Sequence, residues 1–306
     1  MRASTSCSTE GAAAAVISVL IPVYNFDVRP LVESLAGQCL ALESPWEILC
    51  LDDGSTAEFR ALNRALQAIP GVRYEELPQN LGRSAIRNRL AEMASFPYLL
   101  FMDCDSAVVR PDYMAQYAAH CRPDAVLCGG RVYASDPPEN AAFLLHWTVG
   151  KSREEWSAAR RSVQPWHGFM TNNFLIPQKI LLSIRFDERL REYGHEDTLF
   201  GLELERRQIP VLHLDNPLEH IGLEPAAVFL QKSEQAVQNL RRLRELGIVV
   251  PTRLVSISAA VERAGMRRLV LFLLRRLEAR SRRNLLSERP VPAYLDALKL
   301  RWMLGK

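Results

Sequence analysis

Short apolar runs alternate with amphipathic segments along the first hundred residues of the chain. The apolar runs predict strands over residues 16–23, 46–51, 72–77 and 98–102. The segments between them carry apolar residues at helical spacing and predict helices over 28–40, 57–69 and 83–94. Strands and helices that alternate in this way predict a doubly wound α/β fold, in which a largely parallel sheet has helices on both faces.

The pattern changes in the second half of the chain. Further strands are predicted over 125–134, 174–176 and 211–214, and a helix followed by a long active-site loop over 138–161. Residues 196–207 predict a helix, because acids stand in its first turn and arginines in its last. From residue 226 onward strand patterns stop. Helical stretches follow over 226–246, 254–286 with a break at Gly265, and 293–303.

Composition and charge divide the chain further. The 306 residues are 48% hydrophobic and 24% charged, which is enough apolar material to bury a large core. We expect a loose tail over 1–15, an α/β domain over 16–225 and a basic helical region over 226–306. The last region carries 17 Lys and Arg against 6 Asp and Glu, whereas 1–225 carry 21 against 29. An acidic body with a basic C-terminal region predicts two separate roles.

Targeting patterns are weak. The apolar run over 16–23 lacks a signal-peptide cleavage pattern, and no stretch reaches the roughly 20 apolar residues that cross a bilayer. The six cysteines show neither a disulfide framework nor CxxC pairs. We therefore expect a cytoplasmic protein.

Two acidic pairs end predicted strands. Asp52 and Asp53 follow the second strand, and Asp103 and Asp105 follow the fourth, so both pairs lie at the sheet edge where open α/β folds bind ligands. Buried unpaired carboxylates are costly. Mg²⁺ or Mn²⁺ would compensate them, since these ions take carboxylate ligands together with substrate phosphates. The alternative is a solvated turn or a helix cap.

Four segments, in order and spacing, resemble the family-two glycosyltransferases of the GT-A fold: 17–25, 51–56, 80–88 and 103–105. The resemblance continues through 193–197 and His220 and ends near Leu223. It implies a GT-A fold, a nucleotide-diphospho-sugar donor, and Mg²⁺ or Mn²⁺ as the cation. A carboxylate in the base pocket suits a uridine donor.

The same resemblance implies which residues bind the donor and the metal. The base and ribose would meet Pro22, Tyr24, Asp52 and Asp53. The loop and helix start near the phosphates would supply Asn80, Gly82, Arg83 and Arg87. Asp105 and His220 would be ligands of the metal. Asp103 would address either the ribose or the metal. Each set has a plainer alternative: a strand-ending turn, solvated arginines at the start of a helix, and a histidine satisfied by its neighbours.

Catalysis is assigned by resemblance to the start of the 196–207 helix. Asp197 matches the general base that takes the acceptor proton in an inverting transfer, and Glu196 would orient the acceptor hydroxyl. The helix dipole would hold Asp197 ionised. The alternative is that both acids only complement that dipole.

Two other functions are compatible with parts of this sequence. A sugar nucleotidyltransferase would need a glycine-rich phosphate loop, and residues 21–25 contain no glycine. A catalytically inactive module that binds a nucleotide sugar or a partner is the alternative from another class, although the intact acidic set argues against it.

The basic region carries eight arginines around the apolar run 269–274: Arg263, Arg267, Arg268, Arg275, Arg276, Arg280, Arg282 and Arg283. Such a stretch is typical of a helix on an anionic membrane, and it would suit a glycan or lipid-linked acceptor at the inner face of the cell membrane. The alternative is a helix that packs on the domain or on a second subunit. Nucleic acid is not expected as a partner, because Phe272 is the sole aromatic residue between Arg263 and Arg283.

Overall fold

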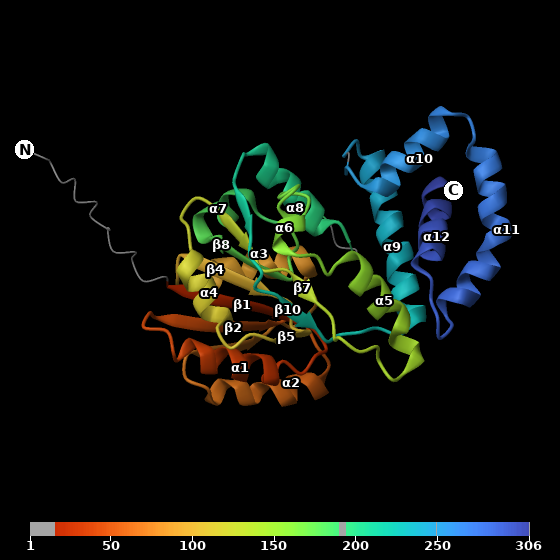
Figure 1. Cartoon of the computed structure of the whole chain (residues 1–306). Helices are drawn as coiled ribbons and strands as arrows, with labels where there is room; N and C mark the ends of the chain where they lie inside the picture. Colours follow the sequence, from red (N-terminus) through yellow and green to blue (C-terminus); the bar gives the residue numbers. More distant parts are fainter. Residues whose placement is uncertain (1–15, 190–193, 249, 306) are drawn as a thin grey trace, which may run out of the picture.

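The computed structural model describes residues 16–189, 194–248 and 250–305, so the tail predicted over 1–15 lies outside the described residues. Its centre is a seven-stranded sheet in the order β3-β2-β1-β4-β8-β6-β9 (Figure 1). β8 runs antiparallel to β4 and β6, and the other pairs are parallel, which confirms a mostly parallel sheet. The strands are β1 (Ile17–Val23), β2 (Trp46–Asp52), β3 (Val72–Glu76), β4 (Tyr98–Met102), β6 (Val126–Cys128), β8 (Asn173–Pro177) and β9 (Val211–His213).

Helices cover both faces of the sheet (Figure 1). Val19 and Ile21 of β1 share one apolar cluster with α1 (Arg29–Cys39) and α4 (Tyr113–His120). Leu20 belongs to the opposite cluster, with side chains from three other helices: α3 (Arg83–Met93), α7 (Gln178–Ile184) and α8 (Glu196–Arg206). Because successive strand residues point to opposite faces, a strand covered on both sides is apolar throughout. α2 (Ala57–Asn63) and a 3-10 helix (Arg64–Ala68) lead from β2 to β3.

A second sheet has the order β5-β10-β7 and consists of β5 (Ser106–Val108), β10 (Leu218–His220) and β7 (Arg131–Val132). The single strand predicted over 125–134 is therefore wrong, because β6 and β7 belong to different sheets. Two glycines separate them. Gly130 has a φ of +88°, and a Cβ on Gly129 would lie 2.3 Å from the backbone oxygen of Asn216. Glycine tolerates both conditions, so the chain can change sheets there.

The segment 138–161 also differs from its prediction. It forms a short 3-10 turn (Ala141–Phe143) and two helices, α5 (Leu144–Arg153) and α6 (Ala158–Arg161), rather than one helix and a long loop.

The described part of the chain after residue 225 is helical, as predicted. Gly265, with a φ of +66°, separates α10 (Arg253–Arg263) from α11 (Arg267–Leu285) at the predicted break. Leu230, Leu298 and Trp302 share a buried cluster with Leu145 of α5, so these helices are packed on the α/β body (Figure 1). No helix among the described residues is long and apolar enough to cross a membrane. The helices are α9 (Ala226–Glu245), α10 (Arg253–Arg263), α11 (Arg267–Leu285) and α12 (Pro292–Leu304). The domain division at residue 225 stays a prediction.

Candidate functional site

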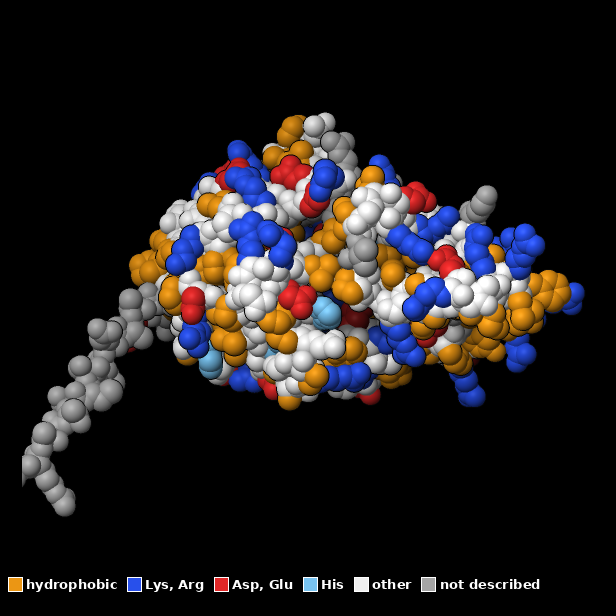
Figure 2. Space-filling model, turned by 90° about the horizontal axis from the view of Figure 1, so that it is seen from above, with side chains coloured by type: hydrophobic (Ala, Val, Ile, Leu, Met, Phe, Trp, Pro, Cys, Tyr) orange, Lys and Arg blue, Asp and Glu red, His pale blue; other side chains and the backbone are white. Residues whose placement is uncertain are grey.

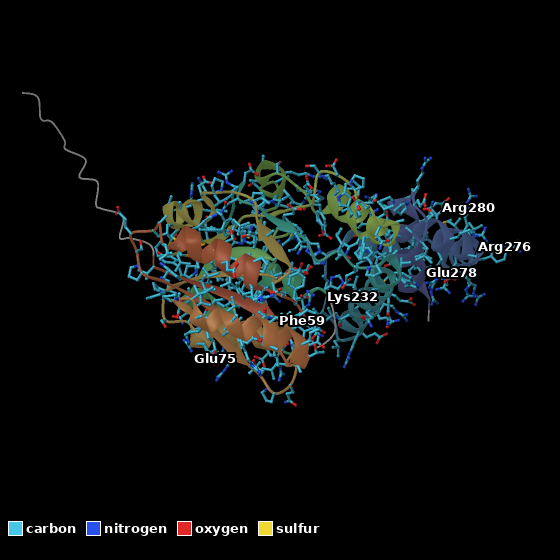
Figure 3. All side chains as sticks on the ribbon, turned by 90° about the horizontal axis from the view of Figure 1, so that it is seen from below. Phe59, Glu75, Lys232, Arg276, Glu278 and Arg280 are labelled. Carbon is cyan, nitrogen blue, oxygen red and sulfur yellow. The ribbon has the colours of Figure 1, made fainter. Side chains whose placement is uncertain are left out.

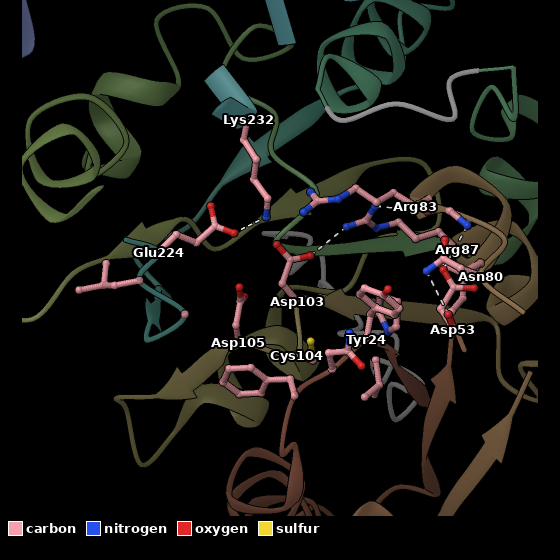
Figure 4. A pocket seen from close by; sticks show the side chains of 18 residues that line it. Tyr24, Asp53, Asn80, Arg83, Arg87, Asp103, Cys104, Asp105, Glu224 and Lys232 are labelled. Atoms are coloured by element: carbon pink, nitrogen blue, oxygen red, sulfur yellow. Dashed lines mark hydrogen bonds and ion pairs between the residues drawn. The ribbon is translucent and has the colours of Figure 1, made fainter. Parts of the chain in front are cut away.

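A cavity of about 540 Å³ lies beyond the carboxyl ends of β1, β2 and β4 (Figure 4). Parallel strands bring their following loops to one edge, which is why segments far apart in sequence meet there. The predicted site residues that line the cavity are Pro22, Tyr24, Asp53, Asn80, Gly82, Arg83, Arg87, Asp103 and Asp105. Lining residues that the sequence analysis did not select include Asn25, Phe26, Glu224 and Lys232.

Asp53 fixes the loop that precedes α3. Its carboxylate accepts hydrogen bonds from the backbone amides of Leu81 at 2.6 Å and Gly82 at 3.1 Å. Burial raises the pKa of Asp53 above its ordinary value. Gly54 allows the loop after β2 to approach the loop before α3, because a Cβ at Gly54 would lie 2.8 Å from the backbone nitrogen of Asn80. Asp53 therefore both lines the cavity and shapes its wall.

Tyr24 places an exposed aromatic ring in the cavity wall. It is 53% exposed, and Figure 4 shows it beside the Asp53 loop. The next residue, Asn25, receives support from the loop after β2. Its backbone amide donates to Ser55 Oγ at 2.8 Å, and its Oδ1 accepts from the Thr56 amide at 2.9 Å. A supported, exposed ring of this kind can stack on a flat heterocycle.

Asp52 does not line the cavity, in contrast to its predicted place. Its carboxylate is fully buried and accepts hydrogen bonds from the Tyr74 hydroxyl at 2.9 Å and the Ser55 amide at 2.7 Å. Arg60 Nε lies 3.6 Å from the same carboxylate. Neighbouring residues of an extended segment point to opposite sides, so Asp52 and Asp53 separate. The structure places Asp52 beneath the site, as a support for its loops.

Asp103 is surrounded by guanidinium groups. Arg87, which is buried, donates from Nη2 to Asp103 Oδ1 at 2.8 Å, and Arg131 Nη2 lies 3.4 Å from Oδ2. Arg131 also donates to Glu154 at 2.9 Å, and that carboxylate accepts from the Tyr133 hydroxyl at 2.6 Å. Both Asp103 oxygens are thus already paired. No sequence motif marks Arg131, Tyr133 or Glu154, which lie in the strand predicted over 125–134 and in the loop predicted within 138–161.

Asp105 faces His220 from the neighbouring strand. β10 pairs with β5 so that His220 stands opposite Ser106, and His220 Nδ1 lies 3.5 Å from Asp105 Oδ1. Gly222 leaves room for the carboxylate, since a Cβ there would lie 2.5 Å from Asp105 Oδ2. Burial disfavours the charged form, but His220 and Arg131 outweigh it and lower the pKa of Asp105. His220 itself is not among the lining residues of the cavity.

Three polar side-chain atoms of this pair lack hydrogen-bond partners. Asp105 Oδ1 and both ring nitrogens of His220 are buried and unsatisfied. Such atoms are costly to bury, and carboxylate oxygen and imidazole nitrogen are both donors to divalent ions. The pair therefore fits a cation, but only as part of a coordination shell. Within the described ranges, no three His, Cys, Asp or Glu side chains form a group that could hold a metal alone.

Glu196 and Asp197 lie in the first turn of α8, outside the cavity lining. Glu196 connects to the cavity through Arg83, whose Nη1 lies 3.4 Å from its Oε1. Burial opposes ionisation of Glu196, but the charges of Arg83 and Arg87 lower its pKa. Burial and the charge of Glu196 raise the pKa of Asp197 to about 6. The helix dipole, which is expected to lower the pKa of Asp197, does not outweigh burial and the charge of Glu196. A carboxyl group with this pKa is still mostly ionised at neutral pH.

One C-terminal helix, α9, contacts the segment that precedes these acids. Asn239 of α9 donates from Nδ2 to the Gly194 carbonyl oxygen at 2.9 Å, just before the first turn of α8. Tyr193, the first residue of the predicted 193–197 motif, lies outside the described residues.

Lys232 brings α9 into the cavity itself. Its side chain points into the cavity, where Nζ pairs with the Glu224 carboxylate (Figure 4). Figure 3 shows Lys232 on the part of the C-terminal region that faces the α/β body. Lys232, Arg83 and Arg87 therefore place three cationic groups around one cavity. Lys232 could not be selected from the sequence, because it lies inside the predicted basic helical region with no motif around it.

Known proteins resemble this chain in sequence over part of its length. Uncharacterised glycosyltransferases from Rickettsia felis and Rickettsia conorii are each 33% identical to it over 89 residues, which is 29% of this chain. The matched segment spans 14% of the length of either relative.

Solved structures resemble it in fold. The mannosyltransferase PcManGT of Pyrobaculum calidifontis, in complex with GDP-Man and Mn²⁺, is 13% identical with a TM-score of 0.52 over 94% of this chain and 87% of that one. A TarS fragment from S. aureus, in complex with UDP-GlcNAc, is 18% identical with a TM-score of 0.50 over 93% and 89%. These similarities confirm the predicted GT-A fold.

The sequence profile of glycosyl transferase family 2 matches residues 18–181. This is more than half of the chain, and it contains the cavity residues from Pro22 to Asp105. The chain therefore belongs to glycosyl transferase family 2.

Proposed function

We propose that this protein transfers a sugar from a nucleotide diphosphate to an acceptor hydroxyl, with inversion at the anomeric carbon and with a divalent cation. The observation that carries this proposal is the composition of one cavity. An exposed aromatic ring, a cationic cluster and the partly unsatisfied Asp105 carboxylate meet there at the carboxyl edge of the sheet. These groups match the base, the diphosphate and the cation of such a donor. The acceptor we propose is a glycan or a lipid-linked sugar in polysaccharide biosynthesis.

The donor would lie across the cavity from Tyr24 to Lys232. Its base would stack on Tyr24 near Asp53, and its diphosphate would reach the cationic groups of Arg83 and Lys232. A uridine diphosphate sugar is the first choice, by family resemblance and because the TarS fragment binds UDP-GlcNAc. A guanosine donor is the alternative, since PcManGT binds GDP-Man.

Asp105 and His220 are the proposed protein ligands of Mg²⁺ or Mn²⁺, and PcManGT contains Mn²⁺. Their unsatisfied atoms favour this assignment, and diphosphate oxygens would complete the shell. When bound, the cation would neutralise charge on the departing diphosphate. Asp103 is the weaker candidate ligand, because Arg87 and Arg131 already pair with its oxygens. It is better suited to orienting the ribose.

Asp197 is the proposed general base. As the acceptor oxygen attacks the anomeric carbon, its proton passes to the Asp197 carboxylate, and the bond to the diphosphate breaks with its electrons on the leaving group. Glu196, held by Arg83, would orient the acceptor hydroxyl. Both acids lie outside the donor cavity, which suits residues on the acceptor side.

Calorimetric titration of UDP into the full chain tests the donor proposal. We expect UDP to bind in the presence of Mn²⁺ and more weakly in EDTA. Lys232→Met should weaken binding about 10-fold or more, because a charge-assisted hydrogen bond contributes roughly 1.5–3 kcal/mol. Lys179→Met, which removes an exposed lysine outside the cavity, is the matched control and should bind like the wild type. Absence of binding by both UDP and GDP would refute the donor proposal, and unchanged binding by Lys232→Met would refute the phosphate contact.

A further inference from the structure

The helix α11 exposes large apolar side chains on one side. Leu269, Phe272 and Leu273 are 53%, 53% and 56% exposed, and Met266 just before the helix is 47% exposed. Their spacing of three and four residues places them on one face. The opposite edge of the helix packs inward, where Ser281 and Leu285 are buried. Large exposed apolar groups gathered on one helix face indicate an interaction surface.

Exposed arginines surround these apolar side chains: Arg263, Arg268, Arg275, Arg276, Arg280 and Arg283. We call these six arginines and the four apolar residues the α11 face. Arg276 lies over the Phe272 ring, 4.8 Å from its centroid. Figure 2 shows orange side chains gathered with blue ones at the C-terminal end of the molecule, and Figure 3 shows Arg276 and Arg280 at the tip of that end.

The acids of this region do not balance the arginines. From Arg253 to Leu285 the described chain has two acidic side chains, Glu262 and Glu278, which are 34% and 23% exposed. Glu262 pairs with Arg244 at 2.6 Å, and Glu278 pairs with Arg301 at 2.8 Å and with Arg282 at 3.2 Å, so both acids are occupied by arginines outside the six named above. The α11 face therefore combines apolar groups with uncompensated positive charge.

We propose that the α11 face binds the surface of a bilayer that contains anionic lipids. Apolar side chains would enter the boundary between headgroups and acyl chains, and the guanidinium groups would meet lipid phosphates. Nucleic acid would satisfy the arginines but leave Leu269 and Leu273 without apolar partners. A second copy of the chain would present the same positively charged face, so the two faces would repel each other. The apolar run is too short to span the membrane, so the helix lies on its surface.

Binding of this kind would hold the donor cavity close to the membrane. The α11 helix packs on α12, whose Trp302 shares the buried cluster with Leu230 of α9, the helix that carries Lys232. A lipid-linked acceptor in the cytoplasmic leaflet would then be the substrate class. This last step rests on the proposed function, whereas membrane binding itself does not.

Co-sedimentation of the full chain with vesicles tests the proposal. We expect the protein to sediment with phosphatidylglycerol–phosphatidylcholine vesicles at about 0.05 M salt, several-fold less at about 0.5 M salt, and little with phosphatidylcholine alone. Two variants should each lose most of the binding: Phe272→Ser with Leu273→Ser, and Arg276→Glu with Arg280→Glu and Arg283→Glu.

Matched controls separate the α11 face from general surface properties. Leu40→Ser removes a side chain that is 75% exposed on the α/β body, and Arg64→Glu with Arg73→Glu and Arg122→Glu changes the net charge equally. Both should bind vesicles like the wild type.

Equal sedimentation with and without anionic lipid, or wild-type binding by the α11 variants, would overturn the proposal. Loss of a dimer in the variants without any vesicle binding would instead make the face a subunit interface. UDP titration of the same variants should be unchanged, so failure here is distinguishable from failure of the donor proposal.

Discussion

Asp105→Ala is expected to lower metal-dependent sugar transfer by at least about 10²-fold, to near background, and to remove the Mn²⁺-dependent gain in UDP binding. The carboxylate is the cavity-lining half of the Asp105–His220 pair, and its Oδ1 has no hydrogen-bond partner. Its removal would leave His220 as the remaining proposed protein ligand of the cation. Mn²⁺ affinity can be measured without turnover, by the paramagnetic relaxation of solvent water.

Asp124→Ala provides the control for this variant, because Asp124 has a 64% exposed side chain on the same domain and lies outside the cavity. It should transfer sugar and bind Mn²⁺ like the wild type. Near wild-type transfer and Mn²⁺ binding by Asp105→Ala, in a protein with an unchanged melting temperature, would show that Asp105 is not a metal ligand.

Asp197→Asn is expected to keep UDP binding and to lower kcat by roughly 10² to 10⁴-fold, because the amide has nearly the same shape but cannot accept a proton. The pH profile of the wild type should also show the ionisation of this proposed base. Burial and Glu196 raise the pKa of Asp197 to about 6, and the base must be deprotonated, so kcat should fall as the pH drops through about 6. The pH dependence of kcat measures this directly.

Glu203→Gln, on the same helix, is the matched control, since Glu203 pairs with Arg206 and Arg207 at the helix surface. Glu203→Gln should keep the wild-type kcat and the same fall of kcat as the pH drops through about 6. A small rate change in Asp197→Asn, with the limb near pH 6 retained, would mean that Asp197 only complements the helix dipole.

The sheet and the main walls of the cavity could be predicted from the sequence. Alternating strand and helix patterns determine a parallel sheet, and a parallel sheet brings the loops after β1, β2 and β4 to one edge. Nine predicted residues consequently line one cavity. The exchange of sheets at Gly129 and Gly130 was missed, because an apolar run around two glycines reads as one strand until a positive φ is considered.

The remaining differences come from contacts between distant segments. Asp52 and Asp53 look equivalent in sequence, but the alternation of an extended chain sends one beneath the site and the other into it. Arg131 lies 28 residues from its partner Asp103 in the sequence, and Lys232 lines the cavity from α9, so both reach the site through packing between distant segments. No local pattern distinguishes such residues from ordinary surface cations, because their roles depend on which elements pack together.

Turnover of a nucleotide sugar tests the central proposal most directly. The purified chain with Mn²⁺ should release UDP from at least one member of a panel of UDP-sugars, followed by NMR in the presence of membrane-derived and soluble glycan acceptors. The signal should disappear in EDTA and in Asp197→Asn, and the product should have the inverted anomeric configuration. Binding of UDP-sugars with no UDP release above the Asp197→Asn background, across the whole panel of donors and acceptors, would contradict the proposal and identify a binding module without catalytic activity.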